Sequence, residues 1–505
     1  MEKLQEGVAK IMSKDENHHL ISKRGKFDTP HPCDELKRIA KELDCDLTDE
    51  KFAKHMDDHD PLRNLRQDFH YPKMKEVLGT DLSLVDPEED CVYFCGNSLG
   101  LCPKNTKKYM DVELNKWAKI GVQGHLQGEG MPWAKCDECL DQDMAKLVGG
   151  RSGEVAIMNG LTVNLHLLLI SFYRPIPTRH KIMCESKAFP SDHYTFQSQI
   201  NLHGYDPETS LLCVEPREGE LTLRTEDILA KIEEEGDSIA VICFSGVQYY
   251  TGQLMDMQSI TQAGHAKGCY VGFDMAHAAG NVPLYLHDWD VDFSCWCTYK
   301  YINSSAGCLA CIFLHEKHKH NDFPKLLGWW GHKFDTRFSM TNELDLCPGA
   351  YGYRISNPAG LLCPPIKASL EVFNKTSMEE IRAKSKLLTA YLEYRIIEKY
   401  GRTNGMSEGT LQQIEGDFQH VHVHIFTPSD PEQRGAQLSL SFSVDISYVF
   451  KELEKRGVIC DERKPSVIRV SPAPLYCSFM DVHRFMDYLD QSLQAAAVTA
   501  AADRK

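Results

Sequence analysis

The chain of 505 residues lacks an apolar stretch long enough to cross a membrane, and it lacks any run of lysine and arginine. Its longest apolar segment, 165–173, is interrupted by His166 and is far shorter than the roughly 20 residues that a membrane-spanning helix needs. The net charge of −16 opposes binding to nucleic acids and to anionic membranes, because both require a cationic surface. We therefore expect neither as a partner.

Signals for export and for nucleotide binding are also missing. The opening residues, MEKLQEGVAKIMSKDEN, have no apolar core and contain acids, so they predict neither a secretory leader nor a mitochondrial presequence. The 19 cysteines are scattered through apolar segments, as buried reduced thiols are, which favours a cytoplasmic location. No P-loop is present and no G-x-G-x-x-G opens a helix, so a nucleotide cofactor has no support.

Short apolar segments recur between residues 155 and 314. They are continuous rather than alternating, which is typical of strands covered on both faces. Residues 255–268 predict a helix between two of them, so the order strand, helix, strand indicates a right-handed βαβ unit. We predict an α/β fold with a mainly parallel sheet, whose strands are 155–158, 181–185, 238–245, 269–274, 292–297 and 307–314.

The two ends of the chain have a different character. Residues 34–43 place Leu36, Ile39, Ala40 and Leu43 on one face of an amphipathic helix. Towards the C-terminus, a helical stretch at 366–400 precedes three alternating segments, which predict a small, half-exposed sheet packed against a helix. We expect a flexible extension (1–30), a helical arm joining the small domain (31–90), a large α/β domain (91–345) and a small α+β domain (346–505).

Two chemically useful side chains close predicted strands. Asp274 ends the segment CYVGFD, with His277 three residues later, and Lys300 ends the segment CTYK. Because ligands of open α/β sheets bind outside the carboxyl ends of the strands, this acid and this amine can face one crevice. Taken singly, Asp274 is better explained as a turn residue and Lys300 as a solvated surface lysine.

Polar groups at three further strand ends match the same crevice. Asn159-Gly160 separates a strand from a helix that starts at Leu161 and Thr162, where free N–H groups favour an anion. Phe189-Pro190-Ser191-Asp192 offers an aromatic face beside polar groups, and Ser245 ends another strand. Ordinary caps and tight turns explain each of these sites individually.

One cofactor needs all of these groups together. Pyridoxal 5'-phosphate (PLP) requires an amine for covalent attachment, an acid at its pyridine nitrogen, an anion site and an aromatic stacking partner. The acid keeps the pyridine protonated, so that the ring can accept electrons. A strand-end Asp followed by a strand-end Lys is the order found in aspartate-aminotransferase-like (fold type I) enzymes, which predicts this fold here.

Ten segments from about residue 35 onward together form a specific pattern. They are YFCGNSLGL (93–101), KWAKIGVQGH (116–125), LTVNLHLL (161–168), KAFPSDHY (187–194), FSGVQYYTGQ (244–253), GCYVGFDMAHAAGNV (268–282), CWCTYKYIN (295–303), GWWGH (328–332), YRISNP (353–358) and IRVSPAPLY (468–476). In these segments the chain resembles the animal-type kynureninases. The resemblance implies PLP-dependent hydrolysis of the Cβ–Cγ bond of L-kynurenine or L-3-hydroxykynurenine to L-alanine and anthranilate or 3-hydroxyanthranilate, in tryptophan catabolism and the route to NAD. It also implies a homodimer with shared active sites.

The resemblance also implies roles for individual residues. Lys300 is the attachment residue and base, Asp274 the partner of the pyridine nitrogen, and Tyr299 a proton shuttle. Arg469 binds the substrate carboxylate, a bidentate task that suits a guanidinium. The implied cofactor shell is Leu161, Thr162, Phe189, Pro190, Ser191, Asp192, Ser245, Asp274, His277, Tyr299 and Lys300, with Trp329 and Asn357 from the neighbouring subunit; Ser98, His125 and Asn357 line the end that holds the aromatic ring.

Other interpretations remain open. A cysteine desulfurase or an aminotransferase shares the fold, although no cysteine lies in a flexible loop at the position that a desulfurase needs. A non-catalytic PLP-binding homologue is a further alternative, which the presence of both Lys300 and Asp274 opposes. We expect no metal: Cys136-x-x-Cys139 has no second pair, Cys308 and Cys311 point to opposite strand faces, and His420, His422 and His424 share a face without a fourth ligand.

Overall fold

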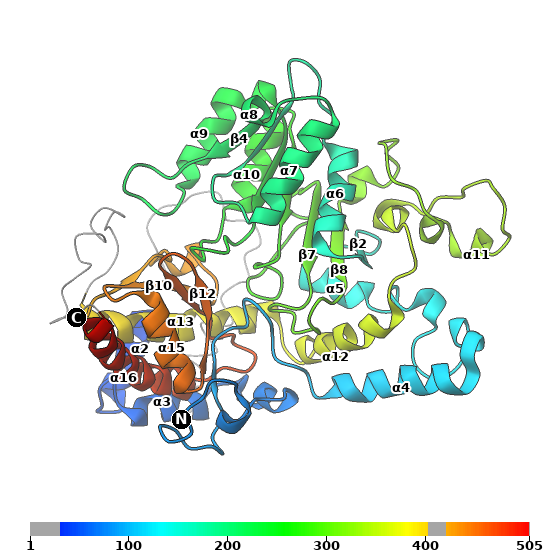
Figure 1. The fold of residues 1–505 in the computed structure, drawn as a ribbon. Coiled ribbons are helices and arrows are strands. Elements are labelled where there is room, and N and C mark those ends of the chain that lie inside the picture. Colours follow the sequence, from blue (N-terminus) through cyan, green and yellow to red (C-terminus); the bar gives the residue numbers. More distant parts are fainter. Residues whose placement is uncertain (1–30, 402–420, 504–505) are drawn as a thin grey trace.

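The computed structural model describes residues 31–401 and 421–503. A large α/β layer and a smaller α+β layer lie side by side, and helix α4 (Asn105–Ile120) with the segment around α11 (Phe334–Arg337) projects away from the smaller one (Figure 1). No helix in these two ranges is long and apolar enough to cross a membrane. The expected extension 1–30 lies outside the described residues.

A seven-stranded sheet forms the large layer, in the order β2-β8-β7-β6-β5-β3-β4. Strands β4, β3, β5, β6 and β7 are mutually parallel, while β8 runs antiparallel to both β7 and β2. This confirms the predicted mainly parallel sheet and adds one strand that the sequence analysis missed, β4. The strands are β2 (Val155–Met158), β3 (Lys181–Glu185), β4 (Leu211–Val214), β5 (Ile239–Ser245), β6 (Tyr270–Asp274), β7 (Phe293–Cys297) and β8 (Ala310–Leu314).

The helices that connect these strands are largely apolar on the side that faces the sheet. Helix α6 buries Leu165, Leu168 and Phe172. Helix α10, which connects β5 to β6, buries Ile260, as the predicted βαβ unit requires. The connecting helices are α6 (Leu161–Phe172), α7 (Pro190–Leu202), α8 (Pro207–Ser210), α9 (Thr225–Glu235) and α10 (Met257–Ala266), and α5 (Asp141–Leu147) precedes β2.

The smaller layer contains a four-stranded sheet in the order β12-β13-β10-β9, antiparallel throughout. Helices α13 and α15 pack with it, α16 packs on α13 and α15, and α2 and α3 of the N-terminal arm pack on α13 and α16. The predicted stretch 366–400 is two helices, α12 and α13, because a turn at Asn374–Ser377 separates them. The bounds are β9 (Val423–Ile425), β10 (Leu438–Phe442), β12 (Asp461–Arg463), β13 (Val467–Val470), α2 (Pro32–Glu42), α3 (Glu50–Asp58), α12 (Cys363–Phe373), α13 (Met378–Tyr400), α15 (Ile446–Lys455) and α16 (Phe479–Asp503).

The prediction that this small sheet is half-exposed is wrong. The strands β9, β10 and β13 are buried along almost their whole length. Their polar face is covered by the loop after β5: Ser439 Oγ donates to the Tyr250 carbonyl oxygen at 2.6 Å, and Arg469 Nη1 to the Tyr249 carbonyl oxygen at 2.8 Å. The alternation of polar and apolar residues therefore marks a hydrogen-bonded domain contact instead of a solvated face.

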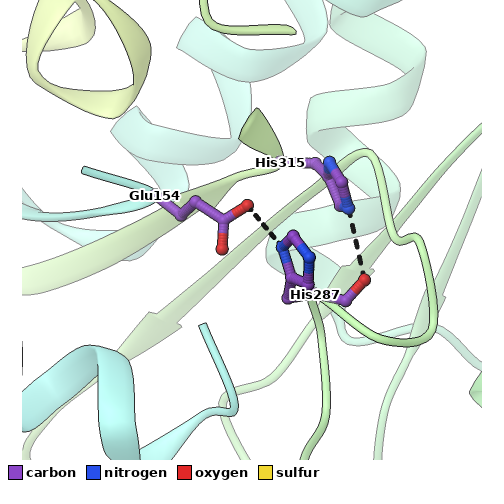
Figure 2. Close-up of side chains that lie close together, drawn as sticks. All are labelled: Glu154, His287 and His315. Carbon is purple, nitrogen blue, oxygen red and sulfur yellow. Dashed lines mark hydrogen bonds and ion pairs between the residues drawn. The ribbon is translucent and has the colours of Figure 1, made fainter. Parts of the chain in front are cut away.

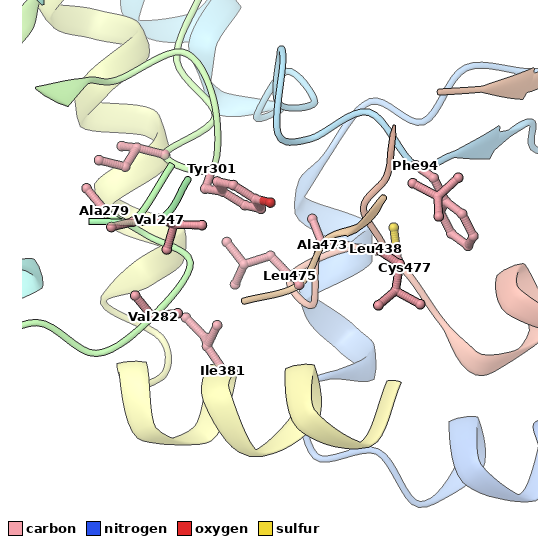
Figure 3. Packing of buried hydrophobic residues seen from close by; sticks show 14 of the residues in the cluster. Phe94, Val247, Ala279, Val282, Tyr301, Ile381, Leu438, Ala473, Leu475 and Cys477 are labelled. Carbon is pink, nitrogen blue, oxygen red and sulfur yellow. The ribbon is translucent and has the colours of Figure 1, made fainter. Parts of the chain in front are cut away.

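A continuous apolar core joins the two layers. Val247, Ala279 and Tyr301 of the large layer lie in the same cluster as Ile381 and Leu475 of the small one (Figure 3). Burying such side chains stabilises the contact by about 25 cal/mol per Å² of apolar surface. The large layer and the small layer therefore hold the crevice between them in a fixed shape.

Candidate active site

A cavity of about 220 Å³ lies at the carboxyl edge of the parallel strands, where the small layer meets the large one. Strands β3, β5, β6 and β7 all run in one direction and end beside it, so the side chains that follow them converge there. The sequence-predicted residues that line it are Ser98, Leu161, Thr162, Phe189, Ser191, Asp192, Ser245, Asp274, His277, Tyr299, Lys300 and Arg469.

Lys300 follows β7 and lines this cavity. Its Nζ lies 3.0 Å from Nε2 of His277, which follows β6, and 5.8 Å from the centre of the Phe189 ring. The pKa of the His277 imidazole is well below its usual range, because the ring is buried and because Lys300 and Arg469 add positive charge nearby. A neutral imidazole can accept a hydrogen bond from the lysine without competing for its charge.

Carboxyl groups gather on the other side of the lysine. Asp274 and Asp192 are buried and hydrogen-bonded to each other, and burial raises the pKa of both groups. The pKa of Asp192 rises further because Asp274 is close by. Asp274 Oδ1 also accepts from the Ala276 N–H at 2.6 Å, and Asp192 Oδ1 has no hydrogen-bond partner. A cation placed between them would satisfy both groups.

The N-termini of α6 and α7 meet at one end of the cavity. Neither helix has a side chain that caps its first N–H groups, and Thr162 Oγ1 lies 2.6 Å from Ser191 Oγ. Asn159 adopts φ +50° directly before α6, a conformation that asparagine tolerates better than most residues. The turn aims free N–H groups and two hydroxyls at the same space, which suits a phosphate.

The guanidinium of Arg469 lies at the opposite end of the cavity. Arg469 of β13 is 1% exposed; its Nη2 donates to Asp461, its Nη1 donates to the Tyr249 carbonyl oxygen, and its Nε has no partner. The sequence analysis allowed that Arg469 simply pairs with an acid, and it does pair with Asp461. Arg469 also lines the cavity, and its buried Nε still lacks a hydrogen-bond partner, so the pairing with Asp461 does not prevent it from binding a ligand.

Ser98 reaches the cavity on a loop that packs directly on the lysine turn. The Gly100 N–H donates to the Tyr299 carbonyl oxygen at 2.8 Å, and a Cβ at Gly100 would lie 2.5 Å from the Lys300 carbonyl oxygen. Only glycine permits this approach. The loop therefore holds Ser98 in a fixed position relative to Lys300.

Four predicted residues do not line the cavity of their own chain. Trp329 is 47% exposed on a short helical turn, and His125 and Asn357 are also exposed. His125 packs edge-on against Trp133 with ring centres 5.5 Å apart, and Trp329 Nε1 donates to the Arg337 carbonyl oxygen. Pro190 opens α7 beside the cavity without lining it.

Other residues line the cavity without having been predicted. Asn97 and Tyr249 belong to segments that the sequence analysis quoted, and their positions next to Ser98 and Ser245 could have drawn attention to them. Arg463 gave no signal, because it is a neighbour of Arg469 only through the pairing of β12 with β13. The remaining unpredicted lining residues are Val247 and Ala276.

A separate cluster of possible metal ligands lies away from this cavity. Figure 2 shows Glu154, His287 and His315, whose ligand atoms lie within 4.8 Å of one another. Glu154 Oε1 accepts from His287 Nδ1 at 2.8 Å and from the Glu316 N–H, while His315 Nδ1 accepts from the Lys317 N–H and its Nε2 contacts the His287 carbonyl oxygen. Hydrogen bonds occupy these atoms, so the expectation of no metal stays a prediction. His420 lies outside the described residues, and His424 is buried in β9.

The residues of the cavity fit PLP. The paired helix N-termini match a phosphate, the exposed face of Phe189 matches a ring, and Asp192 Oδ1 lacks a partner beside Asp274. Lys300 supplies the amine. Binding of PLP uses the anion site, the buried acids and the lysine together.

Comparisons with known proteins agree with this geometry. Residues 131–426 match the family model of class V aminotransferases, and residues 381–489 match that of the kynureninase C-terminal domain. Mouse kynureninase is 55% identical over 92% of this chain and 98% of its own length, and human kynureninase is 53% identical over 92% and 97%. A mutant of C-DES with glycine covalently linked to its PLP cofactor shares the fold, with a TM-score of 0.61 and 14% identity over 81% of this chain and 98% of that one.

Proposed function

Because the chain belongs to the kynureninase family, whose members are PLP-dependent hydrolases acting on carbon–carbon bonds, we propose that its cavity carries out that reaction with the residues described above. The substrates are L-kynurenine and L-3-hydroxykynurenine, and cleavage of the Cβ–Cγ bond gives L-alanine with anthranilate or 3-hydroxyanthranilate. The observation that carries the proposal is the convergence of Lys300, Asp274 and Arg469 on one cavity.

The cofactor would be held by the residues around Lys300. Leu161, Thr162 and Ser191 bind the phosphate at the two helix N-termini, Phe189 stacks on the ring, and Asp274 pairs with the pyridine nitrogen. Asp192, Ser245 and Tyr299 complete the shell. When bound, PLP supplies an aldehyde that reacts with amines and a protonated ring that accepts an electron pair.

The chain's own side chains orient the substrate and move its protons. Arg469 binds the α-carboxylate through its free Nε and the adjacent Nη, which fixes the Cα–H bond near Lys300. The free amine of Lys300 removes the Cα proton, and the neutral His277 at 3.0 Å orients it. A water molecule adds to the side-chain ketone, and the Tyr299 hydroxyl, whose pKa burial raises, carries a proton to the departing group.

Borohydride trapping tests the attachment residue. Reduction of the holoenzyme followed by peptide mapping is expected to place the cofactor on Lys300, and Lys300→Ala is expected to lose turnover and the absorption band of the lysine-bound cofactor. A matched control is Lys187→Ala, a lysine of the neighbouring turn that does not line the cavity. Trapping on another lysine, or normal turnover of the Lys300 variant, would overturn the proposal.

We also propose that two copies of the chain share their active sites. Trp329 and Asn357 are exposed in one chain, where they cannot reach its cavity, and large apolar side chains are exposed around them and on α4. These are Trp117, Val122, Leu326, Leu327, Phe338 and Met340. Covering such a surface with a second copy would bury it and supply Trp329 and Asn357 in trans.

Complementation between the inactive variant Lys300→Ala and the impaired variant Asn357→Ala tests sharing. Lys300→Ala and Asn357→Ala are mixed, denatured and refolded together; a mixed dimer then has one site with Lys300 and Asn357 both intact. Recovery of up to about one quarter of the wild-type activity per chain is expected from random pairing. No recovery, together with a monomer mass in sedimentation, would contradict a shared site.

The domain division and the location remain part of this proposal. Arg66 in the arm 31–90 bonds Asp481 of α16, and Asp57 accepts from the Phe479 and Met480 N–H groups, which supports assigning the arm to the small domain 346–505 and leaving 91–345 as the large one. All 19 cysteines are free thiols, which supports the cytoplasm. Cell fractionation with an antibody to the chain tests the location.

A further inference from the structure

Two arginines share a single carboxylate at the end of the cavity where the proposed function places the substrate carboxylate. Strands β12 and β13 pair antiparallel with Asp461 opposite Arg469. Asp461 Oδ2 accepts from Arg463 Nη2 at 3.0 Å and from Arg469 Nη2. Both arginines line the cavity, and the Nε of each is buried without a hydrogen-bond partner.

The net charge of Arg463, Arg469 and Asp461 determines which ligands this group can bind. Arg469 and Asp461 alone form a neutral pair, which gives an incoming anion little net attraction. The second guanidinium leaves one uncompensated positive charge, because three charged groups carry two positive charges and one negative. The attraction between this positive charge and an incoming anion is strong only where water is largely excluded. The position of the charge at the cavity wall therefore matters.

The number of N–H donors that the protein leaves unused on Arg469 and Arg463 also favours an anionic ligand. A guanidinium has five N–H donors, and the protein accepts from Arg469 only at Nη1 and Nη2. For Arg463 the described residues accept only at Nη2. Its side chain is 37% exposed, so its outer part can meet a ligand that enters the cavity while its Nε stays buried.

We propose that Arg463 is a second substrate-binding residue, which contacts the α-carboxylate together with Arg469, and that Asp461 positions both guanidiniums. This role rests on the placement of the substrate carboxylate at Arg469 proposed above. Arg463 supplies the net charge that attracts the carboxylate, and Arg469 supplies the buried bidentate contact that orients it. The cavity therefore selects amino acids with a free carboxylate over the corresponding amines.

Steady-state kinetics of the holoenzyme test this role. Arg463→Gln keeps a polar side chain but removes the charge, and its KM for L-kynurenine is expected to rise about 10- to 100-fold, the worth of a hydrogen bond to a charged group. kcat is expected to change by less than about threefold, since the bound substrate is still oriented by Arg469. Arg463→Lys restores the charge without the planar fork, and its KM is expected to lie between the two.

A substrate analogue separates carboxylate binding from a structural role. Kynuramine, which is L-kynurenine without its carboxylate, is expected to inhibit wild type and Arg463→Gln with the same Ki. Arg217→Gln is the matched control, because Arg217 also donates to an aspartate, Asp227, but lies on the surface. It is expected to leave both constants unchanged.

The outcomes distinguish a failure of the role proposed for Arg463 from a failure of the carboxylate site proposed at Arg469. An unchanged KM in Arg463→Gln, or a parallel rise of KM and of the kynuramine Ki, overturns the role of Arg463. If Arg469→Lys raises the KM for L-kynurenine while Arg463→Gln does not, only this inference fails; if Arg469→Lys also leaves KM unchanged, the proposed carboxylate site fails. Should Arg463→Gln not fold, judged by its cofactor absorption, a wild-type KM in Arg463→Met, which also removes the charge, overturns the role.

Discussion

Replacing Asp274 by asparagine isolates the charge that the proposed chemistry needs. The side chain is 7% exposed, and its Oδ1 accepts from the Ala276 N–H at 2.6 Å, a bond that an amide oxygen can keep. The substitution therefore preserves shape and the backbone contact while removing the negative charge opposite the pyridine nitrogen. Any large effect then reports the electrostatic pairing rather than a packing defect.

The size of the effect follows from burial. Breaking a buried ion pair by removing one partner costs about 3 to 5 kcal/mol, because the other charge stays buried without compensation. Since each 1.4 kcal/mol is about tenfold, kcat/KM is expected to fall by about two to four orders of magnitude, and PLP to bind correspondingly more weakly. Titration with PLP followed by absorbance gives the binding constant, and turnover of L-kynurenine gives kcat/KM.

Asp141→Asn is the matched control for this experiment. Asp141 is also a buried aspartate, but burial raises its pKa to about 8, so it is largely protonated at neutral pH, and it lies outside the cavity. Its replacement by the isosteric amide is expected to leave kcat/KM nearly unchanged. If Asp274→Asn bound PLP and turned over within about threefold of wild type, the assignment of Asp274 to the pyridine nitrogen would be refuted.

Three further outcomes are expected. Changing His125 and Asn357 together should alter the ratio of kcat/KM values for L-kynurenine and L-3-hydroxykynurenine by about tenfold, a difference that one hydrogen bond explains. Equal losses on both substrates would show that these residues do not distinguish the two aromatic rings. Asp141→Asn should become more stable than wild type as pH rises from about 4 towards 9 in urea unfolding, because the raised pKa of Asp141 makes the folded protein hold a proton that the unfolded chain releases; a constant difference would contradict this. Treatment with EDTA should leave the melting temperature of the holoenzyme unchanged, and a fall of more than about 4 °C would point to a metal at Glu154, His287 and His315.

The sequence predicted much of the large layer because its local signals agree with one another. Strands β2, β3, β5, β6 and β7 fall within a residue or two of the predicted segments, since continuous apolar runs between turns leave few alternatives. Asp274 and Lys300 could be predicted from the same pattern, because the direction of parallel strands dictates that their carboxyl ends share an edge. The helix starts at Leu161 and Pro190 follow from local turn chemistry.

Only the tertiary structure decided which groups meet across the two layers. The alternating segment that holds Arg469 predicts a solvated face by itself, yet the loop at Tyr249 covers that face and turns its guanidinium into the cavity. Arg463 and Asp461 acquire their place from strand pairing, which links residues six to eight positions apart through a register that no periodicity encodes. Local sequence thus determines which groups stand at strand ends, whereas long-range packing determines the charges and donors that surround them, because burial and pairing depend on chain segments that are distant in sequence.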